Sequence, residues 1–458
     1  MEDYTESDRI TPTPPTTNPI DSWLPITQSR SGNAFTSTFH LLCSGIGLQA
    51  LLLPVAFASL GWSWGLVCLL MAFIWQLYTI WILVQLHESV LGTRFSRYLQ
   101  LSIASFGGKL GKLLAIFPTM YLSGGSCVML IITGGTTMKL FYQIISADWS
   151  TSYAKLLSGA EWYLVFTCLA ILIALVLPNL NSLSGVSLIG AVTGVSYCSL
   201  IWIVSLARDR PQGITHDPSK NVSWDVERIA GILNALGIVV LAFRGHNVIL
   251  EIQGTMPSNQ KHPSREPMMK GVITSYIIIA SSLFPLAICG YWAYGDMIPQ
   301  NGMLSALTEF HGQKTAKSVM GITYSLVIMN CLCTYQIFAV PAFDNLEFRY
   351  VLTKNKPCSP WIRKGIRAFF GGLTYLISVA FPFLGSLAAL IGGLAMPLTY
   401  AYPCFMWVLI KKPKSYSTIW FVNLGLGCLG MVLSALLVSA ALWNLVYKGL
   451  DANFFNPR

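Results

Sequence analysis

Two short stretches of sequence, Gly45-Ile46-Gly47 and Phe243-Arg244-Gly245-His246-Asn247, each interrupt a long run of apolar residues. Glycine weakens a helix, and backbone groups that leave the helical ladder at membrane depth are tolerated only around a protein-lined cavity. Breaks at matching places in two halves of a chain are typical of the binding sites of membrane transporters. The two stretches therefore predict a pair of broken transmembrane helices around a binding site.

The composition of the chain indicates a polytopic membrane protein. Of the 458 residues, 54% are hydrophobic and 10% are charged, and the mean hydropathy is +0.58. These values lie far from those of a soluble domain, and a spanning helix needs about 20 apolar residues. Runs without Asp, Glu, Lys or Arg cover residues 31–87, 113–138, 162–207, 271–295, 318–343, 368–410 and 415–447.

Turn residues divide the longer runs and predict an all-α protein with about eleven transmembrane helices. Gly61, Pro178-Asn179 and the segment from Pro382 to Gly385 mark turns between neighbouring spans. An odd number of spans places the two termini on opposite sides of the membrane. The predicted spans are 34–60, 62–86, 112–145, 161–178, 183–206, 228–253, 271–294, 316–345, 366–382, 385–410 and 417–446.

The distribution of basic residues predicts the orientation of the chain. Short cytoplasmic loops retain Lys and Arg, and the basic clusters all follow even-numbered spans. The N-terminus is therefore predicted to be cytosolic and the C-terminus extracellular. Residues 1–30 read as a disordered cytosolic tail, and 447–458 as a short extracellular one. The clusters are Arg94, Arg97, Lys109 and Lys112; Lys261, Arg265 and Lys270; Arg349, Lys354, Lys356, Arg363, Lys364 and Arg367; and Lys411, Lys412 and Lys414.

The charge and the motifs of the chain exclude several classes of function. The net charge of +10 follows from the membrane topology, and the chain has no soluble basic module with interleaved aromatic residues, so we expect no nucleic-acid partner. No nucleophile–base or two-carboxylate pattern predicts an enzyme, and the widely spaced histidines predict no metal site. Asn221-Val222-Ser223 lies in the loop 207–228, which is predicted to face outside, and we expect N-glycosylation at Asn221.

The motifs around both breaks resemble those of the amino acid/auxin permease family. The first is Gly45-Ile46-Gly47-Leu48-Gln49-Ala50-Leu51-Leu52-Leu53-Pro54-Val55-Ala56-Phe57, and the second runs from Gly245-His246-Asn247 to Met256-Pro257-Ser258. The second motif is similar to the lysine/histidine transporter-like branch of plants. Leu86-His87-Glu88, Tyr335-Gln336 and Tyr402-Pro403-Cys404 extend the resemblance, which covers roughly residues 35 to 446.

The resemblance implies a five-plus-five inverted-repeat fold of the leucine-transporter type plus one extra helix. The repeats would cover about 34–206 and 228–410, and the extra helix 417–446. The resemblance also implies a multi-pass plasma-membrane protein in the lipid bilayer, which imports amino acids with protons. The proton gradient would be the driving force, and no cofactor is expected.

The two breaks suggest how an amino acid would be bound. A broken helix offers free N–H groups on one stub and free carbonyl groups on the other. We expect the carboxylate to lie against N–H groups near Gly45, Ile46 and Gly47, and the ammonium against carbonyls near Ala242 and Phe243. The alternative for the glycines is close packing between membrane helices.

Arg244 departs from the family pattern, in which the position before Gly245-His246-Asn247 is usually small. A cation at membrane depth costs about 2.5–3.5 kcal/mol on insertion scales and marks a functional site. We expect Arg244 to bind an acidic substrate group or to stand in for a coupling cation. The alternative is an internal salt bridge with Glu251.

Further polar residues are candidates for the pocket and for proton coupling. Ser126, Asn330 and Tyr335 could line the pocket, although such residues also hold membrane helices together. His246, Glu251 and Glu88 are the candidates for proton coupling. The alternatives are a neutral, hydrogen-bonded His246 and carboxylates at the membrane interface.

Three hypotheses on function remain. The first is a proton-coupled amino-acid symporter. The second is an exchanger, or a transporter of acidic or non-proteinogenic amino-acid-like solutes, which Arg244 motivates. The third, of another class, is an amino-acid sensor without significant flux.

Overall fold

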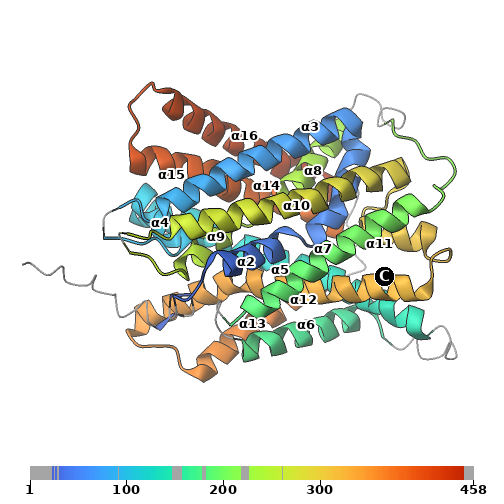
Figure 1. The fold of residues 1–458 in the computed structure, drawn as a ribbon, viewed down its shortest axis with the longest axis horizontal. Coiled ribbons are helices and arrows are strands. Elements are labelled where there is room, and N and C mark those ends of the chain that lie inside the picture. Colours follow the sequence, from blue (N-terminus) through green and yellow to red (C-terminus); the bar gives the residue numbers. More distant parts are fainter. Residues whose placement is uncertain are drawn as a thin grey trace, which may run out of the picture.

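The computed structural model describes residues 23–24, 26–27, 30–90, 92–146, 157–177, 182–217, 226–259 and 261–447. Within these residues the fold is a bundle of helices without β-strands, as predicted (Figure 1). The predicted tails and the Asn221 sequon lie almost entirely outside the described residues.

The helices follow one another along the chain with short connections. They are α2 (Ala34–Gly45), α3 (Leu48–Leu86), α4 (Tyr98–Phe106), α5 (Gly108–Ser146), α6 (Gly159–Val176), α7 (Ser184–Ala207), α8 (Val226–Ala242), α9 (His246–Gly254), α10 (Arg265–Tyr294), α11 (Met303–Ala306), α12 (Lys317–Lys354), α13 (Pro360–Ala380), α14 (Leu384–Met396), α15 (Tyr402–Lys411) and α16 (Thr418–Tyr447). Short 3₁₀ or π segments cover Gly295–Met297, Leu307–His311 and Pro397–Ala401.

All eleven predicted spans correspond to helices. Nine segments of the described chain are each long and apolar enough to cross a membrane. One of them, α3, holds both the second half of the first span and the whole second span, joined at Gly61 in the left-handed region (φ 72°). Division of α3 at Gly61 gives one span more than the nine segments, with α2 as the first half of the first span, and the amphipathic α13 gives the other.

Some boundaries differ from the predicted ones because tertiary contacts extend the helices. The eighth span was predicted to end at 345, but α12 continues to Lys354, because its last turns pack against residues near the N-terminus and before α13. The tenth span contains a π-helical segment at Pro397–Ala401. Helix α4, whose Tyr98 packs inward and bonds the Leu398 carbonyl, was not predicted.

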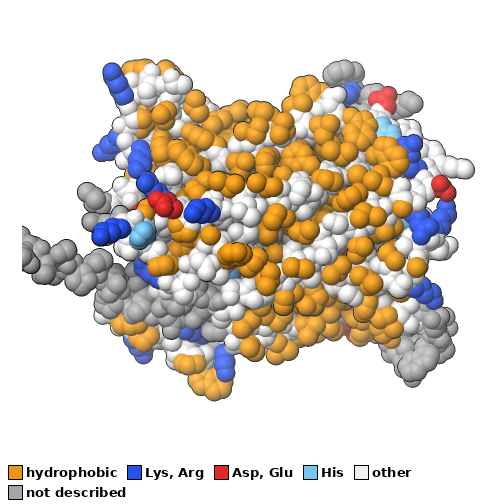
Figure 2. Space-filling view, viewed as in Figure 1, with side chains coloured by type: hydrophobic (Ala, Val, Ile, Leu, Met, Phe, Trp, Pro, Cys, Tyr) orange, Lys and Arg blue, Asp and Glu red, His pale blue; other side chains and the backbone are white. Residues whose placement is uncertain are grey.

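The long α12 lies at the centre of the bundle, packed along α5 and α7 and in contact with α2 and α9 (Figure 1). Helix α8 packs against a second group of helices, namely α3, α14 and α16. The face of the molecule in Figure 2 carries a broad hydrophobic band with Lys and Arg side chains at its two ends. This pattern suits a bilayer around the bundle.

Candidate functional site

The first break separates α2 from α3. Helix α2 ends at Gly45, and α3 begins at Leu48. Between them, Ile46 (φ −112°, ψ 107°) and Gly47 (φ −161°, ψ −154°) are extended. All of these residues are buried. The chain therefore leaves the helical ladder in the middle of the bundle, at the predicted position.

Side chains occupy the carbonyl groups at the end of α2. Gln49, Thr334 and Asn330 are all buried, and each donates a hydrogen bond to a backbone carbonyl of residues 43 to 46. The bonds run from Thr334 Oγ1 to the Cys43 carbonyl (3.0 Å), from Gln49 Nε2 to Ser44 (3.1 Å) and Gly45 (2.8 Å), and from Asn330 Nδ2 to Ile46 (3.2 Å).

The start of α3 is left with free donors. The backbone N–H groups of Gly47, Leu48 and Gln49 make no hydrogen bond to any residue in the described part of the chain. They form the N-terminus of a long helix, where the helix dipole favours a negative charge. The first break therefore presents donors only.

The second break separates α8 from α9. Helix α8 ends at Ala242 and α9 begins at His246, with Gly245 at φ 138° between them. Among the residues that the structure covers, none donates to the carbonyls of Ala242, Phe243 or Arg244. These acceptors at the negative end of α8 suit a cation such as an ammonium group. The second break therefore complements the first.

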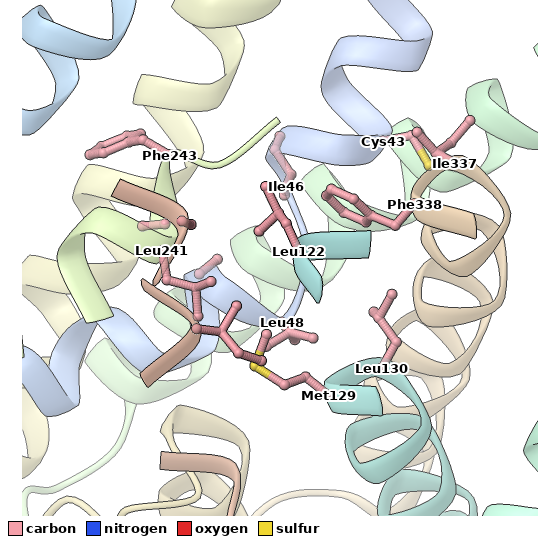
Figure 3. Close-up of a cluster of buried hydrophobic side chains, with 14 of the residues drawn as sticks. Cys43, Ile46, Leu48, Leu122, Met129, Leu130, Leu241, Phe243, Ile337 and Phe338 are labelled. Carbon is pink, nitrogen blue, oxygen red and sulfur yellow. The ribbon is translucent and has the colours of Figure 1, made fainter. Parts of the chain in front are cut away.

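The two breaks are neighbours. A Cβ atom placed on Gly245 would lie 3.9 Å from Ser44 Oγ, at the end of α2. Figure 3 shows Ile46 beside Leu122 and Phe338, and Phe243 pointing away from Ile46. The Phe243 ring packs instead on Phe73, with 5.6 Å between the ring centroids. The residues of both breaks are buried, so solvent does not reach either break in this structure.

Arg244 is buried in this region, and no acidic residue of the described chain pairs with it. It is 1% exposed, and its three guanidinium nitrogens have no hydrogen-bond partner among the described residues. Its guanidinium carbon lies 4.5 Å from the centroid of the Phe338 ring of α12. The alternative of a salt bridge between Arg244 and Glu251 is therefore not formed.

The three predicted lining residues have different environments. Ser126 lies on the face of α5 that carries Leu122 beside Ile46 and Met129 beside Leu48 (Figure 3), and its buried hydroxyl has no partner among the described residues. Asn330 instead ties the first break to α7, because it also donates to the Gly190 carbonyl (2.8 Å). The Tyr335 hydroxyl points to Thr374 of α13 (3.3 Å).

The three proton-coupling candidates lie in different surroundings. His246 Nε2 is 2.9 Å from the Thr79 hydroxyl, as in the alternative of a hydrogen-bonded core histidine. Glu251 is 2% exposed, and its Oε2 has no hydrogen-bond partner in the described part of the chain. Glu88 is half-buried beyond the end of α3, 3.1 Å from Arg94 Nε.

Two polar contacts tie the loop before α4 to other segments at one end of the bundle. Arg97, just before α4, binds Asp344 of α12 through two bonds of 2.6 and 3.3 Å, and both side chains are buried. Arg94 also donates to the Met256 carbonyl after α9. The loop before α4 therefore contacts both the segment after α9 and helix α12.

Sequence reasoning missed several residues of the site. Gln49 and Thr334 cap the first break, Ser123 accepts from Asn247 Nδ2 (3.2 Å), and Phe338 supports Arg244. The one signal in the sequence was a polar residue such as Gln49 inside an apolar span. Phe338 gave none, because aromatic residues are common in such spans.

The arrangement of the helices is a fold of the leucine-transporter type, as predicted. A Na⁺-coupled sialic acid symporter is similar in structure (TM-score 0.54, 11% identity, 93% of this chain and 91% of that one). A nucleobase-cation-symport-1 family transporter in a closed conformation is also similar (TM-score 0.58, 11% identity, 96% and 99%).

The chain belongs to the transmembrane amino acid transporter protein family, which matches residues 30–445. It is 52% identical to lysine histidine transporter-like 8 of Arabidopsis thaliana over 96% of this chain and 84% of that protein. Identity to lysine histidine transporter-like 7 of the same plant is 48%, over 96% and 90%. These relatives are transporters and not enzymes, and they confirm the family resemblance.

Proposed function

We propose that this protein is a proton-coupled symporter that imports amino acids across the plasma membrane and holds them between the two broken helices. The observation that carries the proposal is the complementarity of the breaks. Among the described residues, the N–H groups at the start of α3 and the carbonyls at the end of α8 have no hydrogen-bond partner, and Gly245 of the second break lies near Ser44 of the first. A zwitterion carries a carboxylate for the first set and an ammonium for the second.

Uptake into proteoliposomes tests transport and coupling together. The purified full-length protein is reconstituted, and uptake of labelled amino acids is measured with and without an inward proton gradient. We expect accumulation that a protonophore abolishes. Uptake that ignores the gradient and requires amino acid inside the vesicles would contradict symport and establish exchange.

A backbone substitution tests the proposed binding mode. Leu48→Pro removes one free N–H at the first position of α3, where proline fits a helix and Gly47 before it is already extended. Losing a hydrogen bond to a charged group should weaken substrate binding about 10- to 100-fold. The matched control is Leu48→Ala, which loses the side chain but keeps the N–H. Equal affinities for the two variants would refute carboxylate binding at this helix start.

Orientation and location are part of the proposal. The basic loops, among them the one whose Arg97 binds Asp344 of α12, would face the cytosol, and Asn221 would lie outside. A glycosidase-sensitive size shift that Asn221→Gln removes would support this orientation. Cytosolic labelling of the loop 207–228 would contradict it, and a tagged protein confined to internal membranes would contradict the plasma-membrane assignment.

The proton carrier is proposed to be Glu251. It lies on α9, the half-helix that continues from the second break, and one carboxyl oxygen is buried without a hydrogen bond among the described residues. The charged form of a buried carboxyl group is costly, so its protonation state depends strongly on whether water reaches it. His246 is the less favoured candidate because its Nε2 already forms a hydrogen bond with the Thr79 hydroxyl.

A further inference from the structure

The guanidinium group of Arg244 is the feature of the site that an ordinary zwitterion leaves unused. Every nitrogen of this group is unpaired among the described residues, although the side chain is 99% buried (1% exposed). A buried cation without a counter-charge is strongly unfavourable. A residue in this state therefore points to a negative group that is absent from the structure.

No buried acid of the described chain supplies that negative group. Asp344 binds Arg97, and Glu347 lies 3.1 Å from Arg363 and 3.7 Å from Arg367. Glu251 makes no ion pair with Arg244, because Gly245 interrupts the helix between them. The acids of the bundle are thus committed elsewhere or separated from the guanidinium.

The packing of Arg244 leaves its hydrogen-bonding edges available. The guanidinium carbon lies over the Phe338 ring, 4.5 Å from its centroid. This cation–π contact holds the group in place and uses none of its N–H groups, which have no partner among the described residues and which can bind a carboxylate bidentately. Phe338 itself lies beside Ile46 of the first break (Figure 3), so the guanidinium is near both breaks.

The charges of the site can then be assigned. One carboxylate fits the N–H groups at Gly47 and Leu48, and an ammonium fits the carbonyls at Ala242 and Phe243. A zwitterion satisfies these two sets and leaves the charge of Arg244 uncompensated. A substrate with a second carboxylate neutralises it.

We propose that Arg244 binds a second carboxylate of the substrate, so that this transporter prefers acidic amino acids to neutral or basic ones. The inference rests on the proposed function, because it assumes that the amino acid lies between the breaks. A basic substrate is disfavoured in the same site because its extra cation would face the buried guanidinium in a medium of low dielectric.

The test compares near-isosteric substrates in proteoliposomes. L-Glutamate and L-glutamine differ only in the charge of the distal group, and L-lysine reverses that charge. We expect the wild-type protein to prefer L-glutamate to L-glutamine about 10- to 100-fold, the usual value of a charge-assisted hydrogen bond. Arg244→Gln should abolish the preference by weakening L-glutamate alone.

Arg210→Gln is the matched control. Arg210 also stacks on an aromatic ring, Trp292, at 4.3 Å, but it is exposed and distant from the breaks in the loop after α7. This variant should keep the wild-type order of substrates. If Arg244→Gln does not fold, thermal stabilisation of the wild-type protein by L-glutamate and L-glutamine supplies the same comparison.

The outcomes separate the inference from the proposed function. A wild-type protein that takes up L-glutamine or L-lysine as well as L-glutamate overturns the acidic preference but leaves amino-acid transport intact. Equal weakening of all substrates by Arg244→Gln also overturns it, because Arg244 would then act on a group that all amino acids share. A wild-type protein that neither binds nor transports any amino acid refutes the proposed function itself.

Discussion

The side-chain amide of Gln49 donates a 2.8 Å hydrogen bond to the carbonyl oxygen of Gly45, across the break that separates their two helices. The same nitrogen also reaches the Ser44 carbonyl, at 3.1 Å. Gln49 thus satisfies the end of α2 from the first turn of α3. Because the local acceptors are occupied, the break attracts an anionic group and not a cation.

Gln49→Leu should destabilise the protein and weaken substrate binding. Two buried carbonyls would lose their donor, at a cost of about 1–3 kcal/mol each. Thermal denaturation in detergent and substrate titration measure the two effects. Gln143→Leu, at an exposed position of α5, should change neither. A Gln49→Leu protein with wild-type stability and affinity would show that the cap is unimportant.

Gly245→Ala should destabilise the second break for reasons of backbone conformation. The nearest atom to an added Cβ is Ser44 Oγ at 3.9 Å, so there is room for the methyl group, but φ is 138°. We expect a loss of about 1–3 kcal/mol, detected as a lower unfolding midpoint. Gly124→Ala in α5, where nothing lies within 4 Å of the new atom, is the control and should be neutral or stabilising. The opposite order would contradict the observed break.

Arg97 and Asp344 should show strong coupling in a double-mutant cycle. Removing either side chain leaves a buried charge without its partner, at about 3–5 kcal/mol, whereas Arg97→Met with Asp344→Leu together should be much less harmful. Unfolding of the two single variants and the double variant gives the coupling energy. Lys364→Met, at an exposed position, is the control. Additive losses would mean that the 2.6 Å contact contributes little.

Glu88 and Glu251 should differ in the pH dependence of uptake. Burial by itself raises the pKa of Glu88, but contacts with His87, Ser264 and Ser258 outweigh it and lower the pKa from 4.5 to about 2. The stabilisation from these contacts is complete above the ordinary pKa and is lost as the pH falls toward 2. Glu88 therefore stays ionised between about pH 5 and 8.

We accordingly expect Glu88→Gln to keep the shape of the uptake profile over that pH range, and Glu251→Gln to flatten it. Initial rates in proteoliposomes at fixed membrane potential provide the measurement. A flattened profile for Glu88→Gln would show that Glu88 takes part in proton coupling. An unchanged profile for Glu251→Gln would exclude Glu251 as the proton carrier.

The sequence by itself determined the class of fold, and it predicted interruptions of the helices at residues 45–47 and 243–247. These properties follow from long apolar runs and from glycines such as Gly47 and Gly245, because a bilayer forces every span to satisfy its own backbone. The glycines weaken that rule locally, so the breaks are visible in a single chain.

Only the tertiary structure decided which groups at the breaks are free. Gln49 is near the first break in sequence, but Thr334 and Asn330 reach it from α12, nearly 300 residues away in the chain. The sequence likewise offered Glu251 as a partner for Arg244, and the fold placed Phe338 there instead. Such pairings depend on how rigid helices pack, which local sequence patterns do not encode.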